Sequence, residues 1–195
     1  MTQVAGSHTA RDCAQELIQL LAENPTDPVK AAVAATASLQ KLLQRPDLFD
    51  LGVPREGNHT GESLWLYYDY DLSILTAGLP KGTSVPVHNH GTWEIVAVYR
   101  GAIKYTMYER MDDRSRRYYS QLQVVEDRIM QPLDVSVCPL PPHDIHGFTA
   151  LTDDTHIVAV VGGPYSPVRE YHRPTERFYI EQHQQAWRLG RQPGS

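Results

Sequence analysis

The chain has 195 residues, of which 41% are hydrophobic and 21% are charged, and its formal net charge at pH 7 is −5. This length favours one domain with an appendage, and this hydrophobic content is enough for a packed core. The acidic balance and the lack of long basic runs argue against a nucleic-acid-binding surface.

The N-terminal residues lack the charged and apolar regions of a signal peptide, and no apolar run reaches the length of a membrane-spanning helix. The two cysteines, Cys13 and Cys138, are too few for a disulfide framework and are expected to be buried thiols. We therefore expect a cytoplasmic protein with no membrane partner.

Two helices and a loop are expected before the first strands. Apolar residues at helical spacing predict one helix over residues 10–23 and a second over residues 29–44. Asn24-Pro25 ends the first helix, and Asp27-Pro28 provides a cap and a first turn for the second. Residues 46–61 are rich in proline and glycine and predict a connecting loop.

Short alternating or apolar runs, separated by turn residues, follow from residue 64 onward. Their number and spacing are typical of a β-sandwich or barrel. Besides the segment around residue 90, the expected strands cover residues 64–69, 72–78, 102–110, 118–125, 127–130, 135–138, 145–151 and 156–161. We expect residues 1–61 to form helices and a loop packed on the barrel, and residues 62–195 to form the barrel and a closing segment.

The segment around residue 90 carries a candidate metal-ligand set. His88 and His90 are two residues apart, and Glu94 follows four residues later. Side chains two apart on a strand share a face, so all three can project together if the extended path holds through Thr92. Imidazoles and a carboxylate together suit a divalent first-row metal.

The same segment resembles the first motif of the cupin family. That motif is a glycine, five residues, His-x-His, three or four residues, a glutamate, six residues and a glycine. Its positions are matched here by Gly82, His88, His90, Glu94 and Gly101. The resemblance implies a mainly β fold, the cupin double-stranded β-helix barrel or jelly roll, preceded here by the N-terminal pair of α-helices.

The second cupin motif corresponds to residues 134–148, where Asp134 stands in place of the leading glycine and a proline-rich loop replaces the usual Pro-x-Gly turn. The resemblance makes His146 the third metal ligand, on one face with Phe148. His143 is a rival, but it lies in the loop and out of phase with the strand.

A closer resemblance is to the bacterial cysteine-dioxygenase-like branch of cupins, which includes thiol dioxygenases acting on cysteine and 3-mercaptopropionate. It covers residues 64–170 and is carried by Pro86–Trp93, Val98–Gly101 and Pro141–His146. It implies one Fe(II) ion bound by His88, His90 and His146, and the addition of both atoms of O₂ to a thiol sulfur to give a sulfinate.

The chain departs from this branch at several positions. The Ser-His-Tyr hydrogen-bond relay of thiol dioxygenases aligns with Ile157, Ala159 and Val161, and the cross-linking cysteine of the animal enzymes aligns with Ile95. No arginine or glutamine stands out as the group that binds the substrate carboxylate. Glu94 sits where this branch often has a non-ligand, and it restores the older set of three histidines and one glutamate. The metal site is therefore carried over, and an altered substrate is expected.

We expect a mononuclear non-heme Fe(II) dioxygenase that acts on a small organic substrate and O₂, with Mn, Ni and Zn as alternative metals. One alternative is an isomerase, cyclase or lyase that uses the ion as a Lewis acid. Another is a cupin that binds a small molecule without catalysis. A homodimer is left open.

Residues on the same strand faces as the ligands are expected to line the substrate pocket, namely Val96, Val98 and Phe148. An aromatic residue could replace the missing relay tyrosine. The candidates are Tyr105, which we also place in the pocket, Tyr67 and Tyr165.

Overall fold

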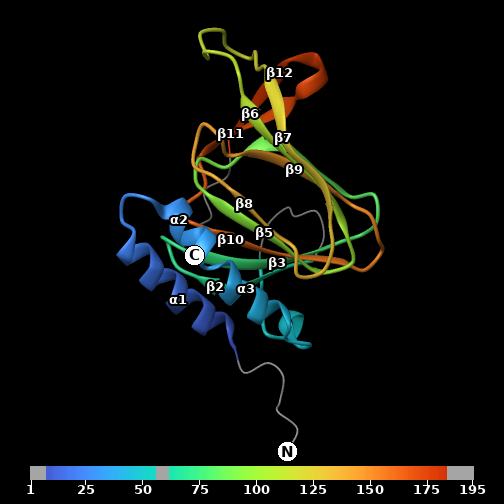
Figure 1. Cartoon of the computed structure of the whole chain (residues 1–195). Coiled ribbons are helices and arrows are strands. Elements are labelled where there is room, and N and C mark those ends of the chain that lie inside the picture. The colour runs from blue at the N-terminus through green and yellow to red at the C-terminus, as the bar shows by residue number, and fades with distance from the viewer. Residues whose placement is uncertain (1–7, 56–61, 184–195) are drawn as a thin grey trace, which may run out of the picture.

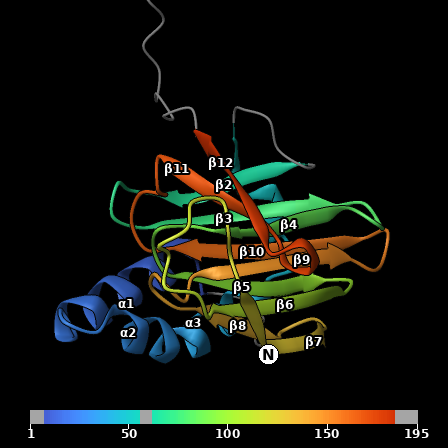
Figure 2. The same ribbon diagram turned by 90° about the horizontal axis from the view of Figure 1, so that it is seen from above.

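The structure, a computed structural model, describes residues 8–55 and 62–183. Two six-stranded β-sheets face one another, and three helices cover the outer side of one of them (Figure 1). Seen from above, the helices are gathered along one side of the stacked strands (Figure 2). In the described part of the chain, no helix is long and apolar enough to cross a membrane.

The helices are α1 (Ala10–Glu23), α2 (Pro28–Ala34) and α3 (Thr36–Leu43). The second helix predicted from the sequence is therefore divided in two. The hydroxyl group of Thr36 donates to the carbonyl oxygen of Val33 at 2.8 Å, a local bond that competes with the regular helical pattern at the break. A short 3-10 helix, Leu48–Asp50, follows in the region predicted as a loop, and residues 56–61 of that loop lie outside the described residues.

The sheets have the strand orders β1-β2-β3-β10-β5-β8 and β12-β11-β4-β9-β6-β7. The strand bounds are β1 Val53–Pro54, β2 Ser63–Tyr68, β3 Ser73–Leu79, β4 Ser84–Asn89, β5 Glu94–Arg100, β6 Ile103–Arg110, β7 Leu122–Met130, β8 Val135–Cys138, β9 Ile145–Ala150, β10 Thr155–Val161, β11 Val168–Arg173 and β12 Phe178–His183.

Strands β3 to β10 give the orders 3-10-5-8 in one sheet and 4-9-6-7 in the other, with antiparallel pairing throughout. Two such interlocked Greek keys make a jelly roll. The predicted fold class, a mainly β jelly roll with N-terminal helices, is confirmed.

Strand β7 differs from the sequence prediction, because Leu122–Met130 is one strand and not two. The predicted division fell at Glu126 and Asp127, two adjacent acidic residues. Both side chains have partners instead: Glu126 accepts a hydrogen bond from Ser136, and Asp127 forms an ion pair with Lys104. A strand at the edge of a sheet can carry polar residues in this way without a turn.

Hydrophobic residues form a core on each side of the sheet that contains β5. Leu17, Leu39 and Leu42 of the helices pack on Ile95 and Val158 of this sheet, which closes its outer face. On the barrel side, the cluster is formed by Leu79, Val96, Val98, Ile103, Tyr105, Met130, Phe148, Ala150 and Ile157. Cys13 and Cys138 are free and buried, as predicted.

Candidate metal site

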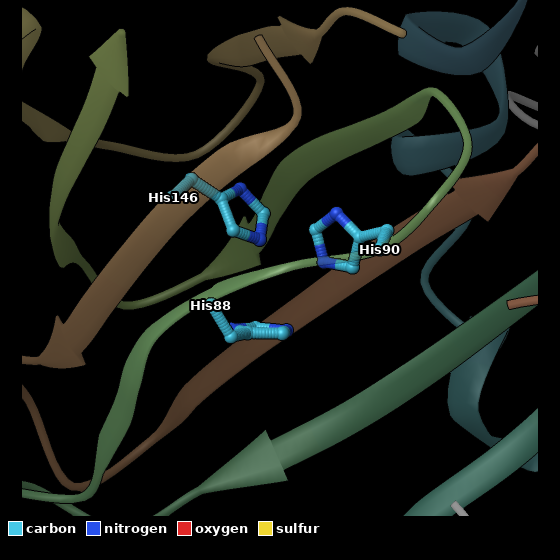
Figure 3. A group of neighbouring side chains, drawn as sticks. All are labelled: His88, His90 and His146. Atoms are coloured by element: carbon cyan, nitrogen blue, oxygen red, sulfur yellow. The ribbon is translucent and has the colours of Figure 1, made fainter. Parts of the chain in front are cut away.

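The three histidines singled out from the sequence lie together inside the barrel (Figure 3). His88 is on β4, His90 follows that strand directly, and His146 is on β9, directly opposite His88 in the strand register. Their exposed fractions are 5%, 1% and 1%. One ring nitrogen from each residue lies within 4.8 Å of the others, so the group could hold a metal ion.

A tight turn after β4 directs the chain from one sheet to the other. Gly91 has φ +80°, and a Cβ atom at this position would press against Ser166, so glycine is required here. The buried carboxylate of Asp144 accepts hydrogen bonds from the backbone N–H groups of His90, at 3.0 Å, and Gly91, at 2.6 Å. Asp144 therefore fixes the turn that carries His90.

This turn corrects the sequence-based geometry for Glu94. The extended path does not continue through Thr92, because the chain leaves the first sheet and Glu94 begins β5 in the opposite sheet. Glu94 still reaches the histidines. Its Oε2 atom lies 2.7 Å from Nε2 of His90 and 3.9 Å from Nε2 of His146. The site is thus built by both sheets.

The Glu94 carboxylate has the environment expected of a metal ligand. Its side chain is 8% exposed, and no residue in the described ranges donates a well-oriented hydrogen bond to Oε2. Burial raises its pKa, which the charges of His146, Arg169 and Arg55 oppose. A buried acceptor oxygen without a donor calls for a missing partner, and a cation at the centre of the three imidazoles would supply one.

Hydrogen bonds to the outer ring nitrogens orient two of the imidazoles. Nδ1 of His88 lies 2.8 Å from the carbonyl oxygen of Pro86, and Nδ1 of His146 lies 2.9 Å from the hydroxyl of Tyr105. Burial lowers the pKa of all three histidines well below the ordinary value. Neutral imidazoles that donate from Nδ1 keep the Nε2 lone pair for a metal ion, so the residues present fit one.

Two arginines border the site, and neither was predicted from the sequence. Arg169 of β11 lies with its guanidinium carbon 4.0 Å from the ring centroid of Tyr165, which in turn is 5.8 Å from that of His90. Arg55, just after β1, lies over the ring of Trp65 at 4.4 Å. Both guanidinium charges act on Glu94. The local field therefore favours anions.

The position of Arg169 follows from the closing hairpin. Strand β11 adds to the edge of β4 so that Tyr171 faces His88, and the two rings stack with centroids 5.7 Å apart. Arg169, two residues earlier, lies on the same face as Tyr171. The alternation of Arg169 and Tyr171 was the available signal, but it had no meaning until the strand partner was known.

The residues expected to line the pocket share one hydrophobic cluster. Val96, Val98, Tyr105 and Phe148 pack together on the barrel side of the sheets, with the Phe148 ring 5.9 Å from that of His146. His143 lies outside the group, half exposed and 3.2 Å from Glu109.

The three positions aligned with the missing relay are buried and apolar. Ile157 joins the barrel cluster, and Ala159 and Val161 pack with Leu75 against Tyr165. Of the three candidate tyrosines, Tyr165 is therefore the one beside the relay positions. The other two lie elsewhere: Tyr105 contacts His146, and Tyr67 packs on the helix-facing cluster.

No protein-family model and no curated protein matches this chain. Solved structures similar to it include KdgF from Halomonas sp., with 20% identity, TM-score 0.42, and coverage of 56% of this chain and 85% of that chain. An RmlC-like cupin from Shewanella frigidimarina has 14% identity, TM-score 0.43, and coverage of 58% and 85%. The DMSP lyase DddQ from Ruegeria pomeroyi has 15% identity, TM-score 0.43, and coverage of 62% and 57%. Values this low support no conclusion about activity or substrate, and the cysteine-dioxygenase-like branch stays a prediction.

Proposed function

We propose that this chain is a metal-dependent cupin enzyme that holds a divalent ion with His88, His90 and His146. The observation that carries this proposal is the convergence of three buried imidazole nitrogens within 4.8 Å of one another. Burial of polar groups costs free energy unless a partner compensates for it. Three neutral imidazoles at such a distance gain that compensation from a shared cation.

Glu94 is the proposed fourth ligand, and Fe(II) is the proposed metal. The Oε2 atom of Glu94 lies on the side of His90 and His146 where the ring Nε2 atoms are, and it has no hydrogen-bond donor in the described part of the chain. A mixed set of imidazole and carboxylate suits Fe(II), with Mn, Ni and Zn as alternatives. Bound iron would supply activation of O₂, and four protein ligands leave open positions on an octahedral ion.

The proposed substrate is a small organic anion, and the proposed reaction is a dioxygenation. Arg169 and Arg55 provide two positive charges beside the ligands, and each is partly buried. The Nε atom of Arg169 is buried and has no hydrogen-bond partner among the described residues. A charged donor of this kind matches a carboxylate. Arg169 would therefore bind and orient the substrate anion next to the ion.

The apolar surface of Ala159 and Val161 supports a substrate different from that of the thiol dioxygenases. These side chains exclude water from the positions that the Ser-His-Tyr relay would occupy, and they can neither donate nor accept a proton. The hydroxyl of Tyr165 is the nearest replacement. Burial raises the pKa of Tyr165, so its hydroxyl stays protonated and acts as a hydrogen-bond donor.

Oxygen consumption by the Fe(II)-reconstituted protein tests this function. The panel contains small thiols and 1,3-dicarbonyl compounds, each with and without a carboxylate group, and His146→Ala serves as the control. We expect uptake with a carboxylate-bearing member and none in the control variant. Metal binding without O₂ uptake by any member would count against the dioxygenase assignment.

One observation favours a second function, in which the ion acts only as a Lewis acid in an isomerase, cyclase or lyase. The pKa of the Glu94 carboxyl is raised, and a carboxylate of higher pKa that does not bind the ion can act as a general base. Turnover of the same panel by the Zn(II)-loaded protein without O₂ would support this function. Metal-dependent binding without turnover would indicate a non-catalytic cupin.

A further inference from the structure

A hydrogen-bonded chain of side chains leads from one metal-ligand candidate to the edge of the barrel. Nδ1 of His146 lies 2.9 Å from the hydroxyl of Tyr105. The Tyr105 hydroxyl shares a side-chain hydrogen bond with Ser136, and the Ser136 hydroxyl donates to Oε2 of Glu126 at 2.9 Å. Nε of Arg128 donates to the other oxygen of Glu126 at 2.6 Å.

The inner part of this chain is closed to solvent, and its outer end is accessible. His146 and Tyr105 are 1% and 0% exposed, and Ser136 is 4% exposed. The side chain of Glu126 is 24% exposed. This series of hydrogen bonds passes from one sheet to the other, because Ser136 is on the edge strand β8 of one sheet and Glu126 is on the edge strand β7 of the other.

The Glu126 carboxylate, at the outer end of the series, determines the direction of each hydrogen bond from there to His146. An ionised carboxylate can only accept, so Ser136 donates to Glu126 and has its lone pairs turned toward Tyr105. Tyr105 then donates to Ser136 and accepts from His146. Arg128 forms an ion pair with the other oxygen of Glu126, which orients the carboxylate and leaves Oε2 for Ser136. The thiol of Cys138 also lies beside the Tyr105 hydroxyl, but a thiol is a weak donor and does not compete with the imidazole N–H.

We propose that Glu126, acting through Ser136 and Tyr105, fixes His146 in the tautomer that carries its proton on Nδ1 and offers Nε2 to the metal ion. Glu126, Ser136 and Tyr105 are thus positioning residues. The inference rests on the proposed function for the identity of the ligand set, but the tautomer is a property of the metal-free protein as well.

The other two histidines provide an internal comparison. Nδ1 of His88 bonds to the backbone carbonyl of Pro86, which is also an acceptor only, so its tautomer does not depend on Glu126. Nδ1 of His90 has no partner among the residues that the structure describes. A change at Glu126 should therefore alter His146 and leave His88 as it is.

Replacement of Glu126 by glutamine is expected to reverse the chain. Arg128 requires an acceptor at its own side of the group, so the amide oxygen faces Arg128 and the amide nitrogen faces Ser136. The nitrogen can only donate, and Ser136 must accept from it and donate to Tyr105 instead. Tyr105 then donates to Nδ1 of His146, which moves the ring proton to Nε2.

Asp127→Asn is the matched control, because Asp127 is the next residue on the same strand. It makes a comparable ion pair with Lys104 at 2.6 Å and accepts from Thr106 at 3.1 Å. Ser136→Ala is the second test variant, since it breaks the chain and leaves the charge of Glu126 in place.

The experiment measures two quantities in the wild type and the three variants: histidine tautomers in the metal-free protein by long-range ¹H–¹⁵N NMR, and the dissociation constant for Co(II) by absorption titration. We expect the Nδ1–H tautomer of His146 in the wild type and in Asp127→Asn, and its loss in Glu126→Gln and Ser136→Ala. The Kd for Co(II) should rise by about 10- to 100-fold in the last two, as is typical when a partner behind a metal ligand is removed.

An unchanged His146 tautomer in Glu126→Gln overturns the inference. So does a change in Glu126→Gln that Ser136→Ala does not share, because the effect would then come from charge alone. Failure of the wild type to bind Co(II) would instead refute the proposed metal site, while the tautomers of the metal-free protein still decide the role of Glu126.

Discussion

Histidines and carboxylates lie close together in two regions of the described barrel, and the two regions differ in what lies between these groups. In the first, His88, His90, His146 and Glu94 surround a point that no donor of the described chain satisfies. In the second, near the closing hairpin, Nδ1 of His172 bonds to the hydroxyl of Ser120 at 3.0 Å, and Nε2 lies 3.5 Å from Glu170.

The second region already contains its cation. The guanidinium of Arg110 donates to Glu170 at 2.8 Å, to both oxygens of Asp112, and to the backbone carbonyl of Tyr119. A guanidinium fills the role that a metal ion would otherwise have, because it neutralises two carboxylates and supplies directed donors to them. The contrast lies in the carboxylates: a side-chain cation satisfies those of the second region, whereas Oε2 of Glu94 in the first has no donor among the described residues.

Removal of Arg110 tests the role of the cation in the second region. Arg110→Met leaves the partly buried Asp112 and Glu170 without their cation, so we expect the free energy of unfolding to fall by about 3 kcal/mol. Urea denaturation followed by circular dichroism measures the loss. Co(II) binding to the folded fraction should stay as in the wild type. A stability change below about 1 kcal/mol would mean that the cluster does not hold the hairpin.

Removal of a histidine from the first region should have the opposite effect, on Co(II) binding and not on stability. His146→Ala is expected to weaken Co(II) binding by more than about 100-fold, which exceeds the usual effect of changing a partner behind a ligand. His143→Ala, three residues earlier and outside the group, should bind Co(II) like the wild type. Equilibrium dialysis with metal analysis checks both. Equal affinities in the two variants would remove His146 from the site.

The pH dependence of stability distinguishes the histidine of the second region. Burial, and then the charges of Arg110 and Arg114, lower the pKa of His172 to about 4, against about 6.5 in the unfolded chain. The unfolded state binds the proton more readily between these values, so stability falls as the pH falls through this window.

At pH 5 this linkage should cost about 2 kcal/mol relative to pH 7. His172→Gln removes it, so the measured quantity is the difference in pH dependence of the unfolding free energy between wild type and variant, in which all other groups cancel. The same pH dependence in both proteins would show that His172 titrates normally in the fold.

The sequence predicted the three histidines because their signals are local. His88 and His90 are two residues apart at the end of one strand, and His146 lies in a second recognisable motif. Glu94 was also predicted, both from the cupin motif and from a shared strand face. The turn at Gly91 invalidates the second reason, since Glu94 reaches the histidines from the opposite sheet. Glu94 therefore lies near the histidines by a different path of the chain from the one expected.

What the sequence did not predict depends on pairing between distant strands. Arg169 reaches the site because β11 adds to β4, and Glu126 reaches Ser136 because the edges of the two sheets meet. The predicted division of β7 into two strands fell at Glu126. Only its partner explains why the strand continues.

The smallest expected effect on metal binding concerns Glu94, a carboxylate beside histidines like Glu170 of the second region. Glu94→Gln should weaken Co(II) binding by about tenfold, because an amide oxygen is a poorer ligand than a carboxylate. Glu109→Gln, at a half-exposed carboxylate outside the group, is the control and should bind like the wild type.

Stability gives the second half of this test. Burial raises the pKa of Glu94, so its charge is a cost to the metal-free fold, and the neutral amide should leave the metal-free protein as stable as the wild type or more so. A residue kept for metal binding would thus lose affinity and not stability on substitution, the reverse of Arg110. Unchanged affinity in Glu94→Gln would leave three histidines as the ligand set and free the carboxylate for a role as a general base.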